Sequence, residues 1–425
     1  MIQLYKIMRN RTLLSAVKYR IYPTKTQKEL IHKHFGCARV VYNYFLDYRQ
    51  KQFSKGIKET YFTMQKELTT LKKQEEYKYL NECASQSLQM SLRQLVTAFD
   101  NFFAKRAKYP NFKSKKNTKQ SYAIPQNIKL SDNKVFIPKF TEGIKAKIHR
   151  KLDENCTIKQ AFVSKVANEY YIAISYENNK LLPKPKIIEN AVGLDMGLAN
   201  LIIRSDGVIY KNHKFLQDKE NKLIKLQRQL SKKQKGSNNR AKAKLKVAKA
   251  HQKITRARDD YLHKISDEIT SMYDFIAVEN LNIKGLIKNK HLSKSIANAS
   301  WSKFINLLSY KAENKGKTLM QIDKFFPSSQ ICSHCGSNTG KKPLHIRSFT
   351  CPYCHTKHDR DLNASINIRN YALGIIDDRY KIKLDKSRVG ITQSYACGDS
   401  NSGVSKYGLL LDTSYLSMKQ EAHLL

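Results

Sequence analysis

The sequence predicts a multidomain α+β chain, in which a β-rich N-terminal domain is interrupted by a helical block and is followed by an α/β domain with a cysteine-rich insertion. Short alternating strands occur at 16–22 and again within 122–176, with helical periodicity between them. A strand-turn-strand pattern begins at residue 191, and four cysteines cluster near the C-terminal end. A chain of 425 residues, 41% of them hydrophobic, has room for roughly two to four domains with their own cores.

The first predicted elements are a strand and two helices. Apolar and basic residues alternate over 16–22, which is typical of a half-buried strand. Thr24 followed by Gln27 forms a capping-box pattern, so a helix is predicted to begin near Gln27 and to end around Gly36. A second helix is predicted from Ala38, and helical periodicity continues to about residue 105.

Residues 105–122 form a basic stretch with seven Lys or Arg residues and no acidic residue. Tyr109 and Phe112 lie among these cations. Cations beside aromatic rings suit contact with phosphates and stacking on bases, so this stretch is predicted to contact nucleic acid.

A second β-rich segment follows. Short alternating runs over 122–176 predict a small β-barrel or sheet that the first strand completes, and the wedge-like barrel is the form expected for the fold class. The LLPKPK segment then indicates a linker, and a new domain is predicted to start near residue 188.

The net charge restricts the classes of partner. The chain carries 78 Lys and Arg residues against 35 Asp and Glu residues, a formal charge of +43. Binding of a polyanion would neutralise this excess of positive charge most directly, so nucleic acid is the expected partner. No run of about 18 apolar residues and no signal-peptide core occur, so neither membrane spanning nor secretion is predicted, and a cytoplasmic, nucleoid-associated protein is expected.

The charge is concentrated in residues 211–260, which hold 17 Lys and Arg residues against 4 Asp and Glu residues. Two helical patterns flank a KGSNN turn at 235–239. This pattern predicts a long helical hairpin with one apolar face and one basic face, and the basic face is predicted to contact a nucleic-acid backbone.

Three carboxylates at the ends of predicted elements form the candidate catalytic set. Asp195 ends an apolar strand, Glu279 ends the strand at 275–278, and Asp361 opens a helix. RNase H-like nucleases and actin-like ATPases both begin with the strand-turn-strand seen at 191–210, so that motif leaves both superfolds open. If these three acids come together in the fold, divalent cations are needed to neutralise their negative charge. Two Mg²⁺ ions could then catalyse phosphodiester hydrolysis, and Mn²⁺ is the alternative metal.

The cysteine cluster consists of two C-x2-C motifs separated by fifteen residues. Four thiolates complete a closed tetrahedral shell, so one structural zinc ion is predicted, with rubredoxin-like iron as the alternative. The nearby histidines are treated as non-ligands, and the cluster is interpreted as an insertion before Asp361. The predicted ligands are Cys332, Cys335, Cys351 and Cys354.

The chain resembles the TnpB family of transposon-encoded RuvC-type nucleases, which are related to type V CRISPR effectors. The stretches that carry the resemblance include KYRIYPTKTQ, GLDMGLANLI, VENLNIKGL, FFPSSQICSHCG and CPYCHTKHDRDLNASINI. They are distributed over nearly the whole chain, and their combination is specific. The initial MIQLYKIMRN precedes the start of the family pattern.

The resemblance implies an RNA-guided DNA endonuclease that binds a transposon-derived guide RNA and double-stranded target DNA beside a short motif, with a monomer expected. It assigns catalysis and Mg²⁺ binding to Asp195, Glu279 and Asp361, and zinc binding to the four cysteines. It also implies that the basic hairpin lines the guide–target duplex channel and that the ribbon contacts target DNA. The implied domains are a wedge-like β domain (1–22 and 122–182), a helical recognition lobe (23–121), an RNase H-like RuvC domain (188–326 and 358–380) and a zinc ribbon (327–357). The end of the chain is rich in Ser, Gly and Thr with sparse periodicity, so residues 381–425 are predicted to be a disordered C-terminal tail.

Two alternatives remain at this point. A transposase that acts on transposon ends without RNA would use a similar set of three carboxylates. A non-cleaving RNA-guided repressor would normally lack one carboxylate, and this sequence has all three.

Overall fold

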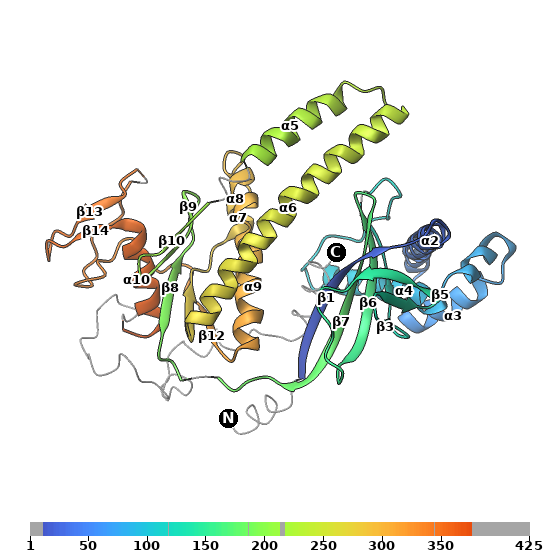
Figure 1. Cartoon of the computed structure of the whole chain (residues 1–425), viewed down its shortest axis with the longest axis horizontal. Helices are drawn as coiled ribbons and strands as arrows, with labels where there is room; N and C mark the ends of the chain where they lie inside the picture. The colour runs from blue at the N-terminus through green and yellow to red at the C-terminus, as the bar shows by residue number, and fades with distance from the viewer. Residues whose placement is uncertain (1–11, 118, 186, 213–216, 344, 376–425) are drawn as a thin grey trace. The chain divides into compact units, whose positions relative to one another are not determined.

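The computed structural model describes residues 12–117, 119–185, 187–212, 217–343 and 345–375. The predicted tail and the initial MIQLYKIMRN lie outside these ranges. The chain divides into two compact units, one that ends at Leu181 and one that begins at Leu182 (Figure 1). Each unit is described by itself.

The first unit is built on a seven-stranded sheet with the order β2-β6-β7-β1-β5-β4-β3. Val17, Tyr19 and Ile21 of β1 are buried, as the alternation predicts, and β1 pairs with both β5 and β7. The strands are β1 (Thr12–Tyr22), β2 (Gln120–Ile124), β3 (Lys129–Ser131), β4 (Lys134–Ile137), β5 (Phe140–Lys147), β6 (Thr157–Val166) and β7 (Glu169–Leu181).

The sheet differs from the predicted barrel because its ladder begins at β2 and ends at β3 without closing. The physical reason is the helix that covers it. Ile31, Phe35 and Ala38 of this helix pack into the same core as the strands, so they bury apolar surface that closure would otherwise have to bury.

The helical block between β1 and β2 has its own core. Thr24 caps α2 and exchanges hydrogen bonds with Gln27, which confirms the predicted capping box. The predicted break at Gly36 is wrong, because α2 continues through this glycine. A single glycine weakens a helix by only about 1 kcal/mol, and the buried neighbours on both sides of it favour the continuous helix. The helices are α2 (Lys25–Ser54), α3 (Tyr61–Leu71), the 3₁₀ helix η1 (Glu75–Glu82) and α4 (Ser85–Phe103).

The second unit contains a five-stranded sheet with the order β10-β9-β8-β11-β12. β11 runs parallel to β8 and β12, whereas β9 is antiparallel to β8 and β10. The strand-turn-strand prediction is confirmed, and Gly207 has the positive φ (+89°) that its turn requires. The strands are β8 (Ala191–Asp195), β9 (Asn200–Arg204), β10 (Ile209–Lys211), β11 (Phe275–Val278) and β12 (Thr318–Gln321).

Both faces of this sheet are covered, which explains the continuous apolar sequence of β11. Ile276 and Val278 pack on α6 and α9 at one face, and Phe275 and Ala277 pack with Ile368 of α10 in a separate cluster. The helices are α5 (Gln217–Ser231), α6 (Asn238–Met272), α7 (Ile283–Leu286), α8 (Ser293–Ala299), α9 (Trp301–Asn314) and α10 (Arg360–Ala372).

The predicted basic hairpin is confirmed as α5 and α6, which extend side by side beyond the sheet of this unit (Figure 1). Ser237 caps α6 by accepting a hydrogen bond from the backbone of Arg240. Val247, Ile254 and Leu262 form part of its buried stripe. The short strands β13 (Ser348–Thr350) and β14 (Lys357–Asp359) pair within the cysteine-rich segment.

Across the described ranges, every helix is too short or too polar to cross a lipid bilayer.

Candidate active site and metal centre

Asp195 and Glu279 come from neighbouring parallel strands. Asp195 is the last residue of β8, and Glu279 directly follows β11. Leu194 pairs with Val278 in the ladder, so the two acids occupy adjacent positions at the carboxyl ends of the two strands. Both side chains are half-buried, and the short strands fix the backbone from which they project.

Asp361 is supplied by the first turn of α10. Asp359 caps this helix, since its Oδ1 accepts hydrogen bonds from the backbone N–H groups of Asp361 at 3.0 Å and Leu362 at 2.9 Å. The helix packs directly on β8, where a Cβ on Gly193 would lie 2.0 Å from the carbonyl oxygen of Ser365. The missing side chain of Gly193 therefore lets α10 approach β8.

The charges that act on Asp195 include those of the other two acids. Burial raises the pKa of Asp195 well above its ordinary value, and the charges of Glu279 and Asp361 raise it further, while Arg360 and Arg347 act in the opposite direction. Burial also raises the pKa of Glu279, and a hydrogen bond from Ser328 opposes this shift. The concentrated negative charge and the all-oxygen donor set fit a hard divalent cation.

The oxygen atoms of the three carboxylates are farther apart than the sulfur atoms of the four cysteines. Within the part of the chain that the structure describes, the four cysteines are the group of potential ligands whose atoms all lie within 4.8 Å of one another, and the three acids form no such group. Arg347 Nη1 lies 3.4 Å from both carboxylate oxygens of Asp361. Asp361 therefore has a cationic partner.

Sequence reasoning missed the residues that orient these acids. Ser328 Oγ donates a hydrogen bond of 2.7 Å to Glu279 Oε1, and Asn363 and Asn367 bind the backbone near Ser328. Ser328 belongs to the PSSQ motif, which supported the resemblance without suggesting a contact. The two asparagines are four residues apart, a spacing that places them on the same face of a helix, and the sequence contains no other indication that they act together.

Asp206, in the turn between β9 and β10, has a structural role. It pairs with the buried guanidinium of Arg204 and accepts a hydrogen bond of 2.6 Å from the hydroxyl of Tyr273. Arg204 also contacts Glu268 of α6 at 3.3 Å. This network ties the β9–β10 turn to α6.

The four predicted cysteine ligands converge. The Sγ atoms of Cys332 and Cys354 are 3.6 Å apart, and those of Cys335 and Cys351 are 3.7 Å apart. A tetrahedral zinc ion with Zn–S bonds of about 2.3 Å places its sulfurs about 3.8 Å apart, so the arrangement fits this ion. The two C-x2-C turns have the same form, since each places a residue with positive φ directly after its second cysteine, Gly336 in one and His355 in the other.

Hydrogen bonding from the side chain and backbone of Thr356 lowers the pKa of Cys354 to about 5, which favours a thiolate ligand. Burial raises the pKa of Cys332 to about 12, a shift that a coordinated cation would oppose. His358 Nε2 lies 3.1 Å from Cys332 Sγ, at hydrogen-bond distance from this sulfur.

Replacement of Cys332 and Cys335 by Ser should release zinc and destabilise the ribbon, because two of four thiolates are lost. Elemental analysis of the purified protein should show about one zinc per wild-type chain and a large loss in the double variant. The Cys156→Ser variant is the matched control, since Cys156 lies outside the cluster. Equal zinc content in all three proteins would contradict the assignment.

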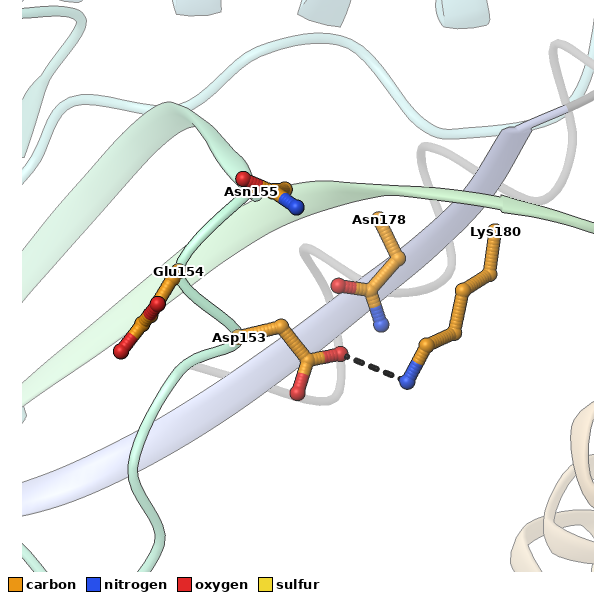
Figure 2. A pocket seen from close by; sticks show the side chains of 5 residues that line it. All are labelled: Asp153, Glu154, Asn155, Asn178 and Lys180. Atoms are coloured by element: carbon orange, nitrogen blue, oxygen red, sulfur yellow. Dashed lines mark hydrogen bonds and ion pairs between the residues drawn. The ribbon is translucent and has the colours of Figure 1, made fainter.

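An open hollow of about 420 Å³ lies in the first unit, between β7 and the loop that precedes β6 (Figure 2). Lys180 of β7 points toward Asp153 and contacts it at 3.2 Å, while Asn178, Glu154 and Asn155 complete the lining. Its lysine is thus already paired, and the hollow contains none of the predicted site residues.

Three family models match the chain. The model described as "Probable transposase" (OrfB_IS605) matches residues 171–290, the TNB domain of Cas12f1-like proteins matches residues 301–368, and a helix-turn-helix domain matches residues 8–58. The described part of 8–58 contains strand β1, the whole of the single helix α2 and the residues just after it, so the structure shows no helix-turn-helix there.

Two curated relatives align over most of the chain. A protein of Streptomyces pristinaespiralis with the name "Putative RNA-guided DNA endonuclease" is 36% identical over 380 residues, which cover 88% of this chain and 94% of the relative. InsQ of Escherichia coli, which carries the same descriptive name, is 30% identical over 373 residues, covering 84% and 91%.

Two solved Cas12f complexes match at 16% identity with TM-scores of 0.33 and 0.35. They cover 84% and 82% of this chain, and 99% and 82% of their own chains. Similarity at this level does not define the fold.

Proposed function

Since this chain belongs to the TnpB family, we propose that it is an RNA-guided DNA endonuclease and that Asp195, Glu279 and Asp361 form its cleavage site. The observation that supports the assignment is the adjacency of Asp195 and Glu279 at the carboxyl ends of β8 and β11, together with the packing on β8 of α10, whose first turn contains Asp361. The charge of +43 supports nucleic acids as the partners.

The sheet supports a RuvC-type, RNase H-like domain. In chain order its strands lie 3-2-1-4-5, and the second strand is antiparallel to the first. The acid cluster favours a nuclease over a phosphate-cradling ATPase, because unneutralised carboxylates repel phosphate whereas they attract divalent cations. The family relationship favours the endonuclease over a transposase that acts without RNA.

In this mechanism the carboxylates are the metal-binding groups. When bound, two Mg²⁺ ions would activate a water molecule and stabilise the leaving oxygen of the phosphodiester. Asp195, whose pKa is raised by the charges of both other acids, would hold these ions together with Glu279 and Asp361. Ser328 restrains Glu279, and Arg347 restrains Asp361 and offers a cation for a nearby phosphate.

The other parts of the chain receive roles in nucleic-acid binding. We assign the sheet of the first unit to the wedge, α2 to α4 to the recognition lobe, the α5–α6 hairpin to the guide–target duplex, and the ribbon to target DNA. The basic stretch 105–122 supports this assignment, since Tyr109 and Phe112 are exposed beside its cations. The protein is expected to act as a monomer.

Binding should weaken steeply with salt, because each neutralised phosphate releases a counterion. Lys246, Lys249 and Lys253 are exposed on α6 at spacings that share one face. Their triple replacement by Ala should reduce the slope of log K against log salt by about 3, whereas replacement by Arg should leave it nearly unchanged. Titrations of guide RNA at several salt concentrations measure this slope, and a flat wild-type titration would contradict the electrostatic argument.

The direct test of function is to express the chain with its flanking locus, sequence the RNA that copurifies, and add Mg²⁺ with a plasmid library that carries a matching target and random flanks. A discrete RNA with cuts beside one short motif establishes the guided nuclease. Absence of RNA, with binding or joining of transposon-end DNA alone, would instead support the transposase. Guided binding without cuts would support the repressor.

A further inference from the structure

Residues 322–331, between β12 and Cys332, form a segment that passes between Glu279 and α10. Ser328 in this segment is buried, with 6% of its surface exposed, and its hydroxyl donates the 2.7 Å hydrogen bond to Glu279 Oε1. The backbone of Ser328 is held in turn from the other side, by a residue of α10. Ser328 therefore connects Glu279 to the helix that carries Asp361.

Two buried asparagines of α10 provide this connection. Asn367 donates through Nδ2 to the carbonyl oxygens of Ser328 at 2.8 Å and Ile331 at 2.7 Å. Asn363 donates to the same Ile331 carbonyl at 2.7 Å and accepts a hydrogen bond of 2.8 Å from the backbone N–H of Ser333. The two side chains thus make four hydrogen bonds to three backbone atoms, those of Ser328, Ile331 and Ser333.

Asn367 holds the backbone of the segment in place at a cost to the stability of α10. Asn367 is fully buried, and its Oδ1 lacks a hydrogen-bond partner among the residues that the structure describes. A buried acceptor without a partner is destabilising, and asparagine is a poor helix former. The two donated hydrogen bonds are what this side chain contributes.

We propose that Ser328 is a positioning residue for Glu279 and that Asn363 and Asn367 hold it in place, so that Glu279 and Asp361 keep a fixed relation. The inference rests on the proposed function. A glutamate has three side-chain torsions, and a hydrogen bond to one oxygen restricts them while leaving the other oxygen as a cation ligand. Since Ile331 precedes Cys332 and Ser333 follows it, the same asparagines also bind the backbone on both sides of the first cysteine ligand.

The test compares Ser328→Ala with Ser328→Thr, which keeps a hydroxyl, and with Ser329→Ala as the matched control. Among the described residues, the Ser329 hydroxyl makes no hydrogen bond to the three carboxylates. Ser328→Ala should raise the Mg²⁺ concentration for half-maximal cleavage, or lower kcat, by about 10- to 100-fold with little change in KM for target DNA. Ser328→Thr should restore part of the loss.

A second readout does not need cleavage. The rise in Tm on addition of Mg²⁺ should occur at higher Mg²⁺ concentrations in Ser328→Ala than in Ser329→Ala. If the two variants show the same Mg²⁺ dependence, or if Ser328→Ala lowers only the basal Tm, the positioning role is rejected. If the wild type fails to cut with its RNA, the proposed function fails, while the Mg²⁺-dependent Tm still tests the contact between Ser328 and Glu279.

Asn367→Asp keeps the shape of the side chain and removes both donors. It should shift the Mg²⁺ dependence in the same direction as Ser328→Ala. A folded Asn367→Asp protein with wild-type Mg²⁺ dependence would overturn the role assigned to the asparagines.

Discussion

Asp195→Asn should abolish cleavage and at the same time stabilise the Mg²⁺-free protein. Cleavage should fall by at least about a thousandfold, because the substitution removes a ligand from a site that supplies several kcal/mol of transition-state stabilisation. Binding of RNA and target DNA should be unchanged. Cleavage assays and binding titrations on the same preparations separate these effects.

The expected gain in stability follows from the raised pKa of Asp195. The folded state holds this proton more tightly than the unfolded state, so the free energy of unfolding falls as pH rises above about 4 and through the raised pKa. The Asn side chain is uncharged, so the Asp195→Asn variant does not lose stability in this way. The Tm of the variant should therefore exceed that of the wild type at neutral pH, and the difference between the two Tm values should shrink in acid. Added Mg²⁺ should raise the Tm of the wild type above that of the variant, because it stabilises only the wild type.

The control is Asp260→Asn, which removes an exposed carboxylate paired with Lys264 on α6. It should leave cleavage and the Mg²⁺-dependent Tm nearly unchanged. The measurements should be made without chelators, which would also remove zinc from the cysteines. An Asp195→Asn protein that still cuts would rule out the proposed site.

Gly193→Ala should separate α10 from β8 and disable the carboxylate site. The new Cβ would lie 2.0 Å from the Ser365 carbonyl oxygen and 2.7 Å from the Arg369 backbone nitrogen, so relief requires movement of backbone. We expect a loss of about 3 kcal/mol or more in the free energy of unfolding. Cleavage should fall by at least about 100-fold even below the Tm, because Asp361 moves with the helix.

Gly36→Ala is the matched control, because a Cβ at this helical position would have no neighbour within 4 Å. Replacing a mid-helix glycine by alanine should stabilise the protein by up to about 1 kcal/mol. Urea unfolding of the two variants should therefore give changes of opposite sign. A Gly193→Ala protein with wild-type stability and cleavage would show that the close packing of α10 on β8 is not required.

Most local features of the fold were predictable from the sequence because they depend on neighbouring residues. The alternation at Val17, Tyr19 and Ile21 predicts β1, and the KGSNN turn predicts the α5–α6 hairpin. The predicted end of the helix at Gly36 was wrong, because the low helix propensity of glycine is a small effect. Burial of Phe35, Cys37 and Ala38 outweighs it. The sequence left open whether these strands form a barrel or a sheet, because the outcome depends on the packing of α2 against the strands, which is a contact between elements.

By itself the sequence determined the chemistry available to this protein: the carboxylates Asp195, Glu279 and Asp361, the two C-x2-C motifs and the excess of positive charge. Residue type and short spacings fix these features without knowledge of packing. Only the tertiary structure decided that α10 crosses β8 at Gly193 and that Ser328, held by Asn363 and Asn367, reaches Glu279. Such contacts join residues far apart in the chain, so they depend on how helices and strands pack, which periodicity and spacing do not encode.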